Sequence, residues 1–318
     1  MLLVKLFFGL SILILGAEYL ISSAITIGRR FNLSELFIGI IIIGFGTSLC
    51  ELFVSIDAVL RNASELSLGN IIGSNIANIL LVVGSTALIK SYQIPKLSSL
   101  DLTTHIFSTI LFTMVCFYSY INLYWGIFFL FCFGVYFFQI IKKSKDLTKE
   151  NQNKHDEYNI LEKKIFKHPF TLGPTIILMS IFLIFSGSDL TVQSAIEISR
   201  FLGVSESIIG LSLIAVGTSL PEIASGIAAV RKNKFSMIVG NVIGSNLYNI
   251  LLIIGASTFF NNYNYNLKNI AHDLIFLNFC LILFTFLTVK NIQITKKISL
   301  LMLAVYISYL GFIFSKTV

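Results

Sequence analysis

The chain has 318 residues, of which 55% are hydrophobic and only 12% charged, and its mean hydropathy is +0.85. This composition excludes a soluble globular protein and indicates a chain that crosses a membrane many times. The net charge of +7 does not indicate nucleic-acid binding, because most basic residues fall in the loops on one side of the predicted spans.

Apolar runs along the chain predict an all-α membrane protein. A hydrocarbon core of about 30 Å requires about 20 apolar residues per helix. Runs of that size predict ten transmembrane helices, at residues 2–27, 35–60, 68–89, 101–121, 124–141, 170–198, 205–230, 236–258, 270–289 and 298–315. The first run is interpreted as a span and not as a signal peptide, because no small-residue cleavage site follows it.

One long polar stretch, at residues 142–169, divides the chain. It predicts a cytoplasmic linker between a first five-helix repeat at 1–141 and a second at 170–318. With the N-terminus outside, most of the 23 Lys and Arg residues lie in cytoplasmic loops, and the outer side keeps only Lys5, Arg61, Arg200, Lys268 and Lys316. The positive-inside rule therefore predicts a multi-pass protein of the inner (plasma) membrane with both termini outside.

The second half of the chain repeats the first. Position n matches position n + 171 without a gap from Gly16 to Gly84. Five spans per repeat is an odd number, so the second copy must insert upside down relative to the first. Inverted repeats of this kind place a substrate site near the middle of the membrane, where helices are broken at corresponding points.

Each half carries two polar motifs within its apolar spans. Gly46-Thr47-Ser48-Leu49-Cys50-Glu51 returns as Gly217-Thr218-Ser219-Leu220-Pro221-Glu222, and the segment Gly69–Asn78 returns as Gly240–Asn249. A charge at the bilayer centre costs about 2.5–3.5 kcal/mol, so an acid there is functional by default. Glu51 and Glu222 are therefore the leading candidates for a functional site.

Spacing adds further oxygen ligands to the two acids. Thr47 and Glu51 are four residues apart and share a helix face, as do Ser74 and Asn78 and their partners in the second half. If the four segments meet, they form an all-oxygen shell, which suits a hard cation such as Ca²⁺ or Na⁺. No His or Cys joins it, which argues against Zn²⁺ or Cu⁺. Two carboxylates neutralise one Ca²⁺, and the same pair could hold Na⁺ ions or protons.

Several other polar or reactive residues are interpreted as structural. Asp101 and His105 are predicted to form an interfacial polar face, and Glu18 and Asp189 to bond neighbouring helices. The four cysteines form neither a disulfide framework nor a metal motif, and all but Cys50 are predicted to be small buried residues. Pro221 should break the second GTSLPE helix. Cys50 takes its place in the first copy, so a bend there depends on Gly44, Gly46 and the hydroxyls.

The doubled GTSLPE-type and GNxxGSNxxN-type motifs resemble the two alpha repeats of the sodium/calcium exchanger family, in the calcium/cation antiporter superfamily. The resemblance covers about residues 16–90 and 187–260, and the short linker is similar to that of the short prokaryotic members. It implies a Ca²⁺ site with flanking Na⁺ sites, formed by Glu51, Glu222, Thr47, Thr218, Ser48, Ser219, Ser74, Ser245, Asn78, Asn249, Gly44 and Ala215. Many relatives carry Asp where this chain has Asn249.

The resemblance implies an antiporter that exchanges Ca²⁺ for Na⁺ by alternating access, with spans one and six sliding past a fixed core. Such a protein is not an enzyme, uses no cofactor and requires no protein partner beyond the lipid bilayer. Two alternatives stay open: a Ca²⁺/H⁺ or other cation/proton exchanger with the same central site, and a cation channel. An intramembrane enzyme is not favoured, because the chain has no HExxH or GxSxG motif.

Overall fold

The computed structural model describes residues 2–118, 120–147, 165, 170–201 and 217–317. Eight helices in this part are long and apolar enough to cross a membrane, and the bent pair Glu35–Thr47 and Leu49–Leu60 makes up to nine. These helices coincide with nine of the predicted spans. The predicted span 205–230 begins outside the described residues, so the count of ten stays a prediction.

The first repeat supplies α1 (Leu2–Arg30), α2 (Glu35–Ile38), the π-helical turn η1 (Gly39–Gly44), α3 (Phe45–Thr47), α4 (Leu49–Leu60), α5 (Ser64–Ala77), the π-helical turn η2 (Asn78–Val82), α6 (Val83–Ile89), β1 (Tyr92–Gln93), α7 (Ser99–Phe117) and α8 (Leu123–Leu147). The second supplies α10 (Leu172–Phe201), α13 (Leu220–Arg231), α14 (Phe235–Leu247), the π-helical turn η4 (Tyr248–Ile253), α15 (Ile254–Ser257), α16 (Leu267–Val289), β2 (Gln293–Ile294) and α17 (Lys296–Thr317). Helix α8 continues to Leu147, into the segment predicted as linker. Residues 148–164 and 166–169 lie outside the described residues.

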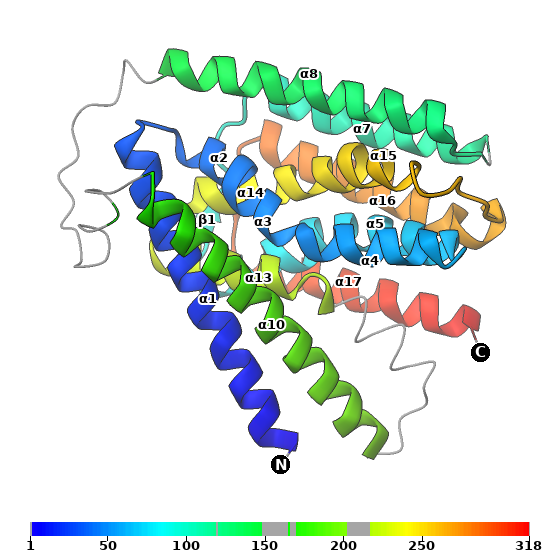
Figure 1. Ribbon diagram of the computed structural model, residues 1–318, viewed down its shortest axis with the longest axis horizontal. Coiled ribbons are helices and arrows are strands. Elements are labelled where there is room, and N and C mark those ends of the chain that lie inside the picture. Colours follow the sequence, from blue (N-terminus) through cyan, green and yellow to red (C-terminus); the bar gives the residue numbers. More distant parts are fainter. Residues whose placement is uncertain (1, 119, 148–164, 166–169, 202–216, 318) are drawn as a thin grey trace.

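The first helices of the two repeats pack against each other in opposite directions. Helices α1 and α10 lie side by side and cross the other helices obliquely (Figure 1). A Cβ atom added to Gly187 would lie 2.5 Å from the backbone nitrogen of Leu13 and 2.8 Å from the carbonyl oxygen of Gly9. A Cβ at Gly173 would instead meet Ile27. Equivalent helices therefore run antiparallel, as inverted repeats require, and glycines allow their backbones to touch.

The helices that carry the GNxxGSNxxN motifs form the centre of the molecule. In the most apolar stretch of α5–η2–α6, 78% of the residues are buried, and in α14–η4–α15 the share is 94%. The other unbroken spans reach only 22–39%, as expected for helices with one face in lipid. Most of the motif residues therefore lie where both lipid and bulk water are excluded, whereas Gly69, Asn70 and Gly73 line a cavity.

A second glycine seam joins the two repeats at the centre. A Cβ at Gly240 of α14 would lie 2.4 Å from the carbonyl oxygen of Leu36, and one at Gly39 would lie 2.5 Å from that of Met237. Further along, Gly44 approaches the backbone of Ser245. The α2–η1 segment thus lies directly against the backbone of α14, which brings the first GTSLPE-type motif beside the second GNxxGSNxxN motif.

The loops gather into two groups at opposite ends of the spans, as the predicted topology requires. At the basic end, Lys90 Nζ donates to Asn233 at 2.6 Å, Lys234 pairs with Glu35 at 2.7 Å, and β1 pairs antiparallel with β2. At the other end, Asn62 bonds Asn261. Asn62 and Asn233 occupy equivalent positions after α4 and α13, and both have positive φ, which asparagine tolerates at a helix end.

Candidate cation site

A helix begins immediately after the same serine in each GTSLPE-type motif. The first copy bends by 42° between Thr47 and Leu49, with Ser48 at the break. In the second copy Ser219 stands at the same place, immediately before α13. The bend in the first copy therefore forms without a proline. The π-helical turn η1, which ends at Gly44, lies just before it, and such turns are frequent at functional sites.

The two breaks place Glu51 and Glu222 in the first turns of α4 and α13. Unpaired amide groups give the N-terminal turn of a helix a partial positive charge, which favours a carboxylate there. Both acids are 0% exposed, and they lie close enough for direct electrostatic repulsion. None of their four carboxylate oxygens has a hydrogen-bond partner in the part of the chain that the structure describes.

Two buried carboxylates without partners are unstable as an isolated pair. Burying a single charge without compensation costs several kcal/mol, and two like charges add repulsion. The acids must therefore bind a cation or protons. Within the described ranges, no third His, Cys, Asp or Glu joins them in a metal-binding group, which leaves neutral oxygens to complete the shell.

Buried hydroxyl and amide groups of the predicted set also point to a ligand. Ser48, Ser74, Ser219, Asn78 and Asn249 are at most 3% exposed. Each has a buried side-chain oxygen without a hydrogen-bond partner among the described residues. Unpaired buried polar atoms are rare in folded proteins. Their concentration around two acids fits an oxygen-lined site for a hard cation.

The other predicted ligands either form hydrogen bonds within the protein, line a cavity or lie outside the described residues. The Thr47 hydroxyl donates to the carbonyl of Ile43 at 3.1 Å, which is consistent with a contribution of this residue through its backbone. Ser245 donates to Asn241 at 3.3 Å and to the Gly44 carbonyl at 3.5 Å. Thr218 is half-buried and lines a cavity. Ala215 lies outside the described residues.

Two equivalent asparagines, for which the sequence predicted no role, form hydrogen bonds to the GTSLPE-type segments. Asn70 donates to the carbonyl of Glu51 at 3.3 Å and to Ser55 at 3.0 Å. Its counterpart Asn241 accepts from Thr47 at 3.3 Å and donates to Ser225 at 3.1 Å. Their signal was present in the sequence, since each is the second residue of a GNxxGSNxxN motif. Each ties a central helix to a GTSLPE-type segment.

The prediction of an interfacial polar face at Asp101 and His105 is wrong. Both are buried, at 3% and 1% exposure. Asp101 accepts a hydrogen bond from Tyr136 at 3.1 Å, and Asp273 accepts one from Tyr309 at the same distance. These two pairs join α7 to α8 and α16 to α17, so they are repeat-related. Helix periodicity showed that the residues share a face, but packing against α8 and α14 decided that the face points inward.

Glu18 and Asp189 differ, although they occupy equivalent positions. Glu18 forms an ion pair with Arg231 at 3.2 Å, across from α1 to α13. Asp189 accepts from Gln193, in its own helix, at 3.0 and 2.9 Å. The expectation that both bond a neighbouring helix is confirmed for Glu18 and wrong for Asp189 in this structure. The four cysteines are all free thiols.

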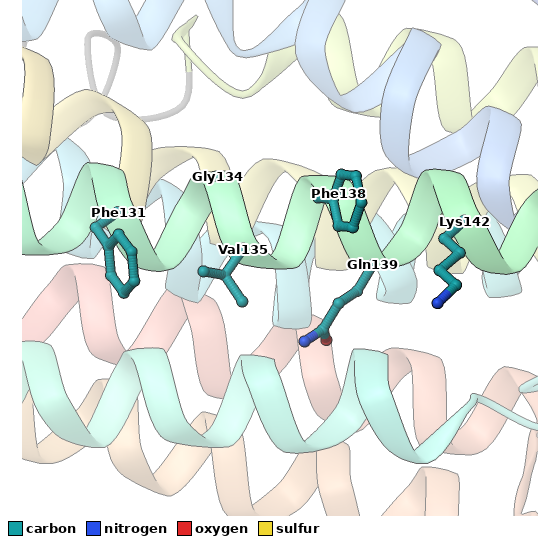
Figure 2. Close-up of a pocket in the computed structure, with 6 residues that line it drawn as sticks. All are labelled: Phe131, Gly134, Val135, Phe138, Gln139 and Lys142. Atoms are coloured by element: carbon teal, nitrogen blue, oxygen red, sulfur yellow. The ribbon is translucent and has the colours of Figure 1, made fainter.

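Two cavities differ in whether predicted cation ligands line them. One, of about 420 Å³, is lined by Ser74 and Thr218 at the site and by Glu65 and Asn70 on one side of it. Another, of about 480 Å³, lies along the outer face of α8 and is lined by Phe131, Gly134, Val135, Phe138, Gln139 and Lys142 (Figure 2). Phe131 and Phe138 are more than 60% exposed, so this second hollow belongs to the lipid-facing surface. Only the first reaches the predicted ligands.

The equivalence of the two breaks can be tested at Cys50, which occupies the position of Pro221 in the first helical turn. Proline is tolerated there because the amide hydrogen is not needed for the helix. We expect Cys50→Pro to melt within a few degrees of the unmodified protein. Phe53→Pro, inside α4, will lose about 3 kcal/mol or more of stability. Thermal melting of the purified variants measures both effects. Equal destabilisation by the two prolines would show that the breaks are not equivalent.

Comparison with known proteins agrees with this architecture. A family model described as sodium/calcium exchanger protein matches residues 1–142 and 172–315. The sodium/calcium exchanger MaX1 of Methanosarcina acetivorans is 32% identical over 295 residues, covering 80% of this chain and 82% of the relative. The inner membrane protein YrbG of Escherichia coli is 29% identical, with 78% and 76% covered.

Solved structures extend the likeness to the fold. The sodium-calcium exchanger NCX_Mj, soaked with Na⁺ and Sr²⁺, superposes with a TM-score of 0.81 at 26% identity, covering 98% of this chain and 97% of that one. The fold and the buried acid pair define a membrane transporter of cations built from inverted repeats. More narrowly, the chain belongs to the sodium/calcium exchanger family. It is a cation antiporter of the short prokaryotic type and not an enzyme.

Proposed function

We propose that the chain moves Ca²⁺ out of the cell in exchange for Na⁺, by alternating access to one central site. The observation that carries the proposal is the pair of fully buried carboxylates without hydrogen-bond partners among the described residues. Two carboxylates balance one Ca²⁺, and oxygen is the ligand that Ca²⁺ and Na⁺ prefer. Because the site is single, Ca²⁺ and the counter-ion compete for it, and competition of this kind is what couples their fluxes.

Na⁺ is favoured as counter-ion by the neutral groups around the acids. The buried Ser48, Ser74, Ser219 and Ser245, on the same motifs as the acids or on the central helices, supply hydroxyl oxygens, which can coordinate Na⁺ but do not accept a proton near neutral pH. Asn249 supplies an amide in place of a third acid, so Glu51 and Glu222 are the two carboxylates of the centre among the residues that the structure describes. MaX1 and NCX_Mj are both named for exchange of sodium and calcium.

The distribution of basic residues between the two ends of the spans supports one orientation in the membrane. The end that gathers Lys90, Arg231, Lys234 and Lys290 faces the cytoplasm in this proposal, and both termini lie outside. The Escherichia coli relative is described as an inner membrane protein. A cysteine placed near the C-terminus would then react with an impermeant maleimide added to intact cells. Protection from that reagent would reverse the orientation.

The counter-ion is tested by ⁴⁵Ca²⁺ uptake into proteoliposomes. Vesicles loaded with Na⁺ should take up Ca²⁺ when diluted into Na⁺-free buffer, because outward Na⁺ flow drives the exchange. Vesicles loaded with K⁺ should not, with or without an imposed pH gradient. Uptake driven by the pH gradient and indifferent to Na⁺ would replace this proposal with Ca²⁺/H⁺ exchange. Ca²⁺ entry without any counter-ion gradient would indicate a channel.

A further inference from the structure

A row of three buried polar side chains extends from the candidate site to helix α7. The Asn78 amide nitrogen donates to the Asn246 Oδ1 at 3.0 Å, and the Asn246 Nδ2 lies 3.2 Å from the His105 Nε2. All three residues are at most 1% exposed. The row connects Asn78, a predicted ligand, to a helix that supplies no predicted ligand.

The direction of each hydrogen bond in the row follows from the first. The Oδ1 of Asn246 accepts from Asn78, so its amide nitrogen faces His105. An imidazole nitrogen accepts a hydrogen bond only when it carries no proton. With the amide in this orientation, the ring of His105 accepts as the neutral tautomer with its proton on Nδ1, an atom that has no hydrogen-bond partner among the described residues. At the other end, the Asn78 nitrogen is used, and its Oδ1 has no partner among the described residues. That oxygen is the atom that a cation requires.

The second repeat has no such row in the part that the structure describes. Asn249 and Asn75 are the repeat equivalents of Asn78 and Asn246, and neither amide has a hydrogen-bond partner there. The repeat-related pairs Asp101–Tyr136 and Asp273–Tyr309 align α7 with α16. By that alignment, Leu277 stands where α7 has His105, since each is four residues after its aspartate. The histidine therefore fixes only one of the two central amides.

We propose that His105 is a positioning residue for the transported cation, acting through Asn246 to hold the amide oxygen of Asn78 available as a ligand. The inference rests on the proposed function and deepens it. If the Asn78 amide turned around, its NH₂ group would face the cation and its carbonyl oxygen would face the Asn246 Oδ1, so the hydrogen bond between the two asparagines would be lost. Groups that orient a metal ligand typically change metal affinity 10–100-fold when they are removed.

A matched pair of substitutions tests the role of the acceptor. His105→Gln keeps an oxygen that can accept from Asn246, whereas His105→Met has the same length and no comparable acceptor. Ser108→Ala is the control, because that hydroxyl is on the same helix and donates to the backbone carbonyl of His105, at 3.1 Å, and not to the imidazole ring. Ca²⁺ titration by calorimetry on purified protein gives Kd, and Na⁺-driven uptake gives KM and the maximal rate.

We expect His105→Met to raise Kd and KM for Ca²⁺ about tenfold with little change in maximal rate. His105→Gln and Ser108→Ala should stay within about twofold of the unmodified protein. Equal affinities for the methionine and glutamine variants, whether both normal or both weakened, overturn the inference. If the methionine variant does not fold, His105→Leu takes its place, since leucine occupies the equivalent position 277. Unmodified protein that binds no Ca²⁺ would overturn the proposed function itself, and the inference with it.

Discussion

Substitution of either Glu51 or Glu222 by glutamine will abolish Na⁺-driven Ca²⁺ uptake. Each substitution removes one of the two fully buried charges that neutralise Ca²⁺. Leaving a buried charge uncompensated costs about 3–5 kcal/mol, which corresponds to a loss of more than about 100-fold in affinity. The measurement is uptake into proteoliposomes that contain equal amounts of each protein.

Asp57→Asn is the matched control for this experiment. Asp57 lies in α4 with Glu51, but it is exposed and pairs with Arg61 at 2.8 Å. Its removal should leave uptake unchanged, because exposed ion pairs contribute little. Residual uptake above about a tenth of normal in either glutamate variant would show that the pair does not carry the cation. A tenfold loss corresponds to only about 1.4 kcal/mol, which is less than half of the expected cost.

Thermal stability of the glutamate variants distinguishes loss of the cation site from loss of the fold. Glutamine removes an unpartnered buried charge, so both glutamate variants should melt at a higher temperature than the unmodified protein when no cation is present. Ca²⁺ should stabilise the unmodified protein, because it binds the folded state, and should not stabilise the variants. Variants that melt lower without cation would indicate that the carboxylates support the fold.

The second large effect is expected at the central glycine seam. Gly240→Val will prevent stable folding, because its Cβ would lie 2.4 Å from the Leu36 carbonyl oxygen and 3.0 Å from the Gly39 Cα. These are backbone atoms, which cannot rotate away as a side chain can. Overpacking commonly costs about 1–3 kcal/mol even where side chains can adjust, and here α2–η1 must separate from α14.

Size-exclusion profiles and melting curves in detergent measure this effect. Gly134→Val is the control, since Gly134 lies on the outer face of α8 (Figure 2) and has no neighbour within 4 Å of an added Cβ among the described residues. A monodisperse Gly240→Val protein that melts like the control would show that the backbone contact between α2–η1 and α14 is not needed for folding.

The sequence predicted the spans well because lipid imposes a simple length rule. Span boundaries at Leu2, Glu35 and Leu60 agree closely with the structure. The inverted repeat was also predicted, since a constant offset of 171 is visible without any contacts. Each acid is visible as a charge in an apolar run, and the role of the two acids as ligands stays a prediction. The placement of neutral residues was harder, because serine, threonine and asparagine occur in membrane helices for many reasons.

What the sequence did not predict depends on contacts between distant segments. The role of Asn241 requires α3 and α13 on either side of it. His105 reaches Asn246 only because α7 packs on α14. The bend at Ser48 occurs without the proline that would have signalled it. In each case a local pattern was compatible with several environments, and tertiary packing selected one.

The ion pair between Glu18 and Arg231 has a consequence for the direction in which the transporter rests. A perfect two-fold repeat would make the outward-open and inward-open states equal in free energy, because the symmetry operation interchanges them. Leu60 stands at the repeat equivalent of Arg231, and Asp189 bonds within its own helix, so this pair exists on one side only. An exposed pair contributes at most about 1 kcal/mol, yet that amount shifts a two-state population about fivefold. Differences between the repeats at the ends of the helices can thus set whether the resting transporter is open to the outside or to the cytoplasm.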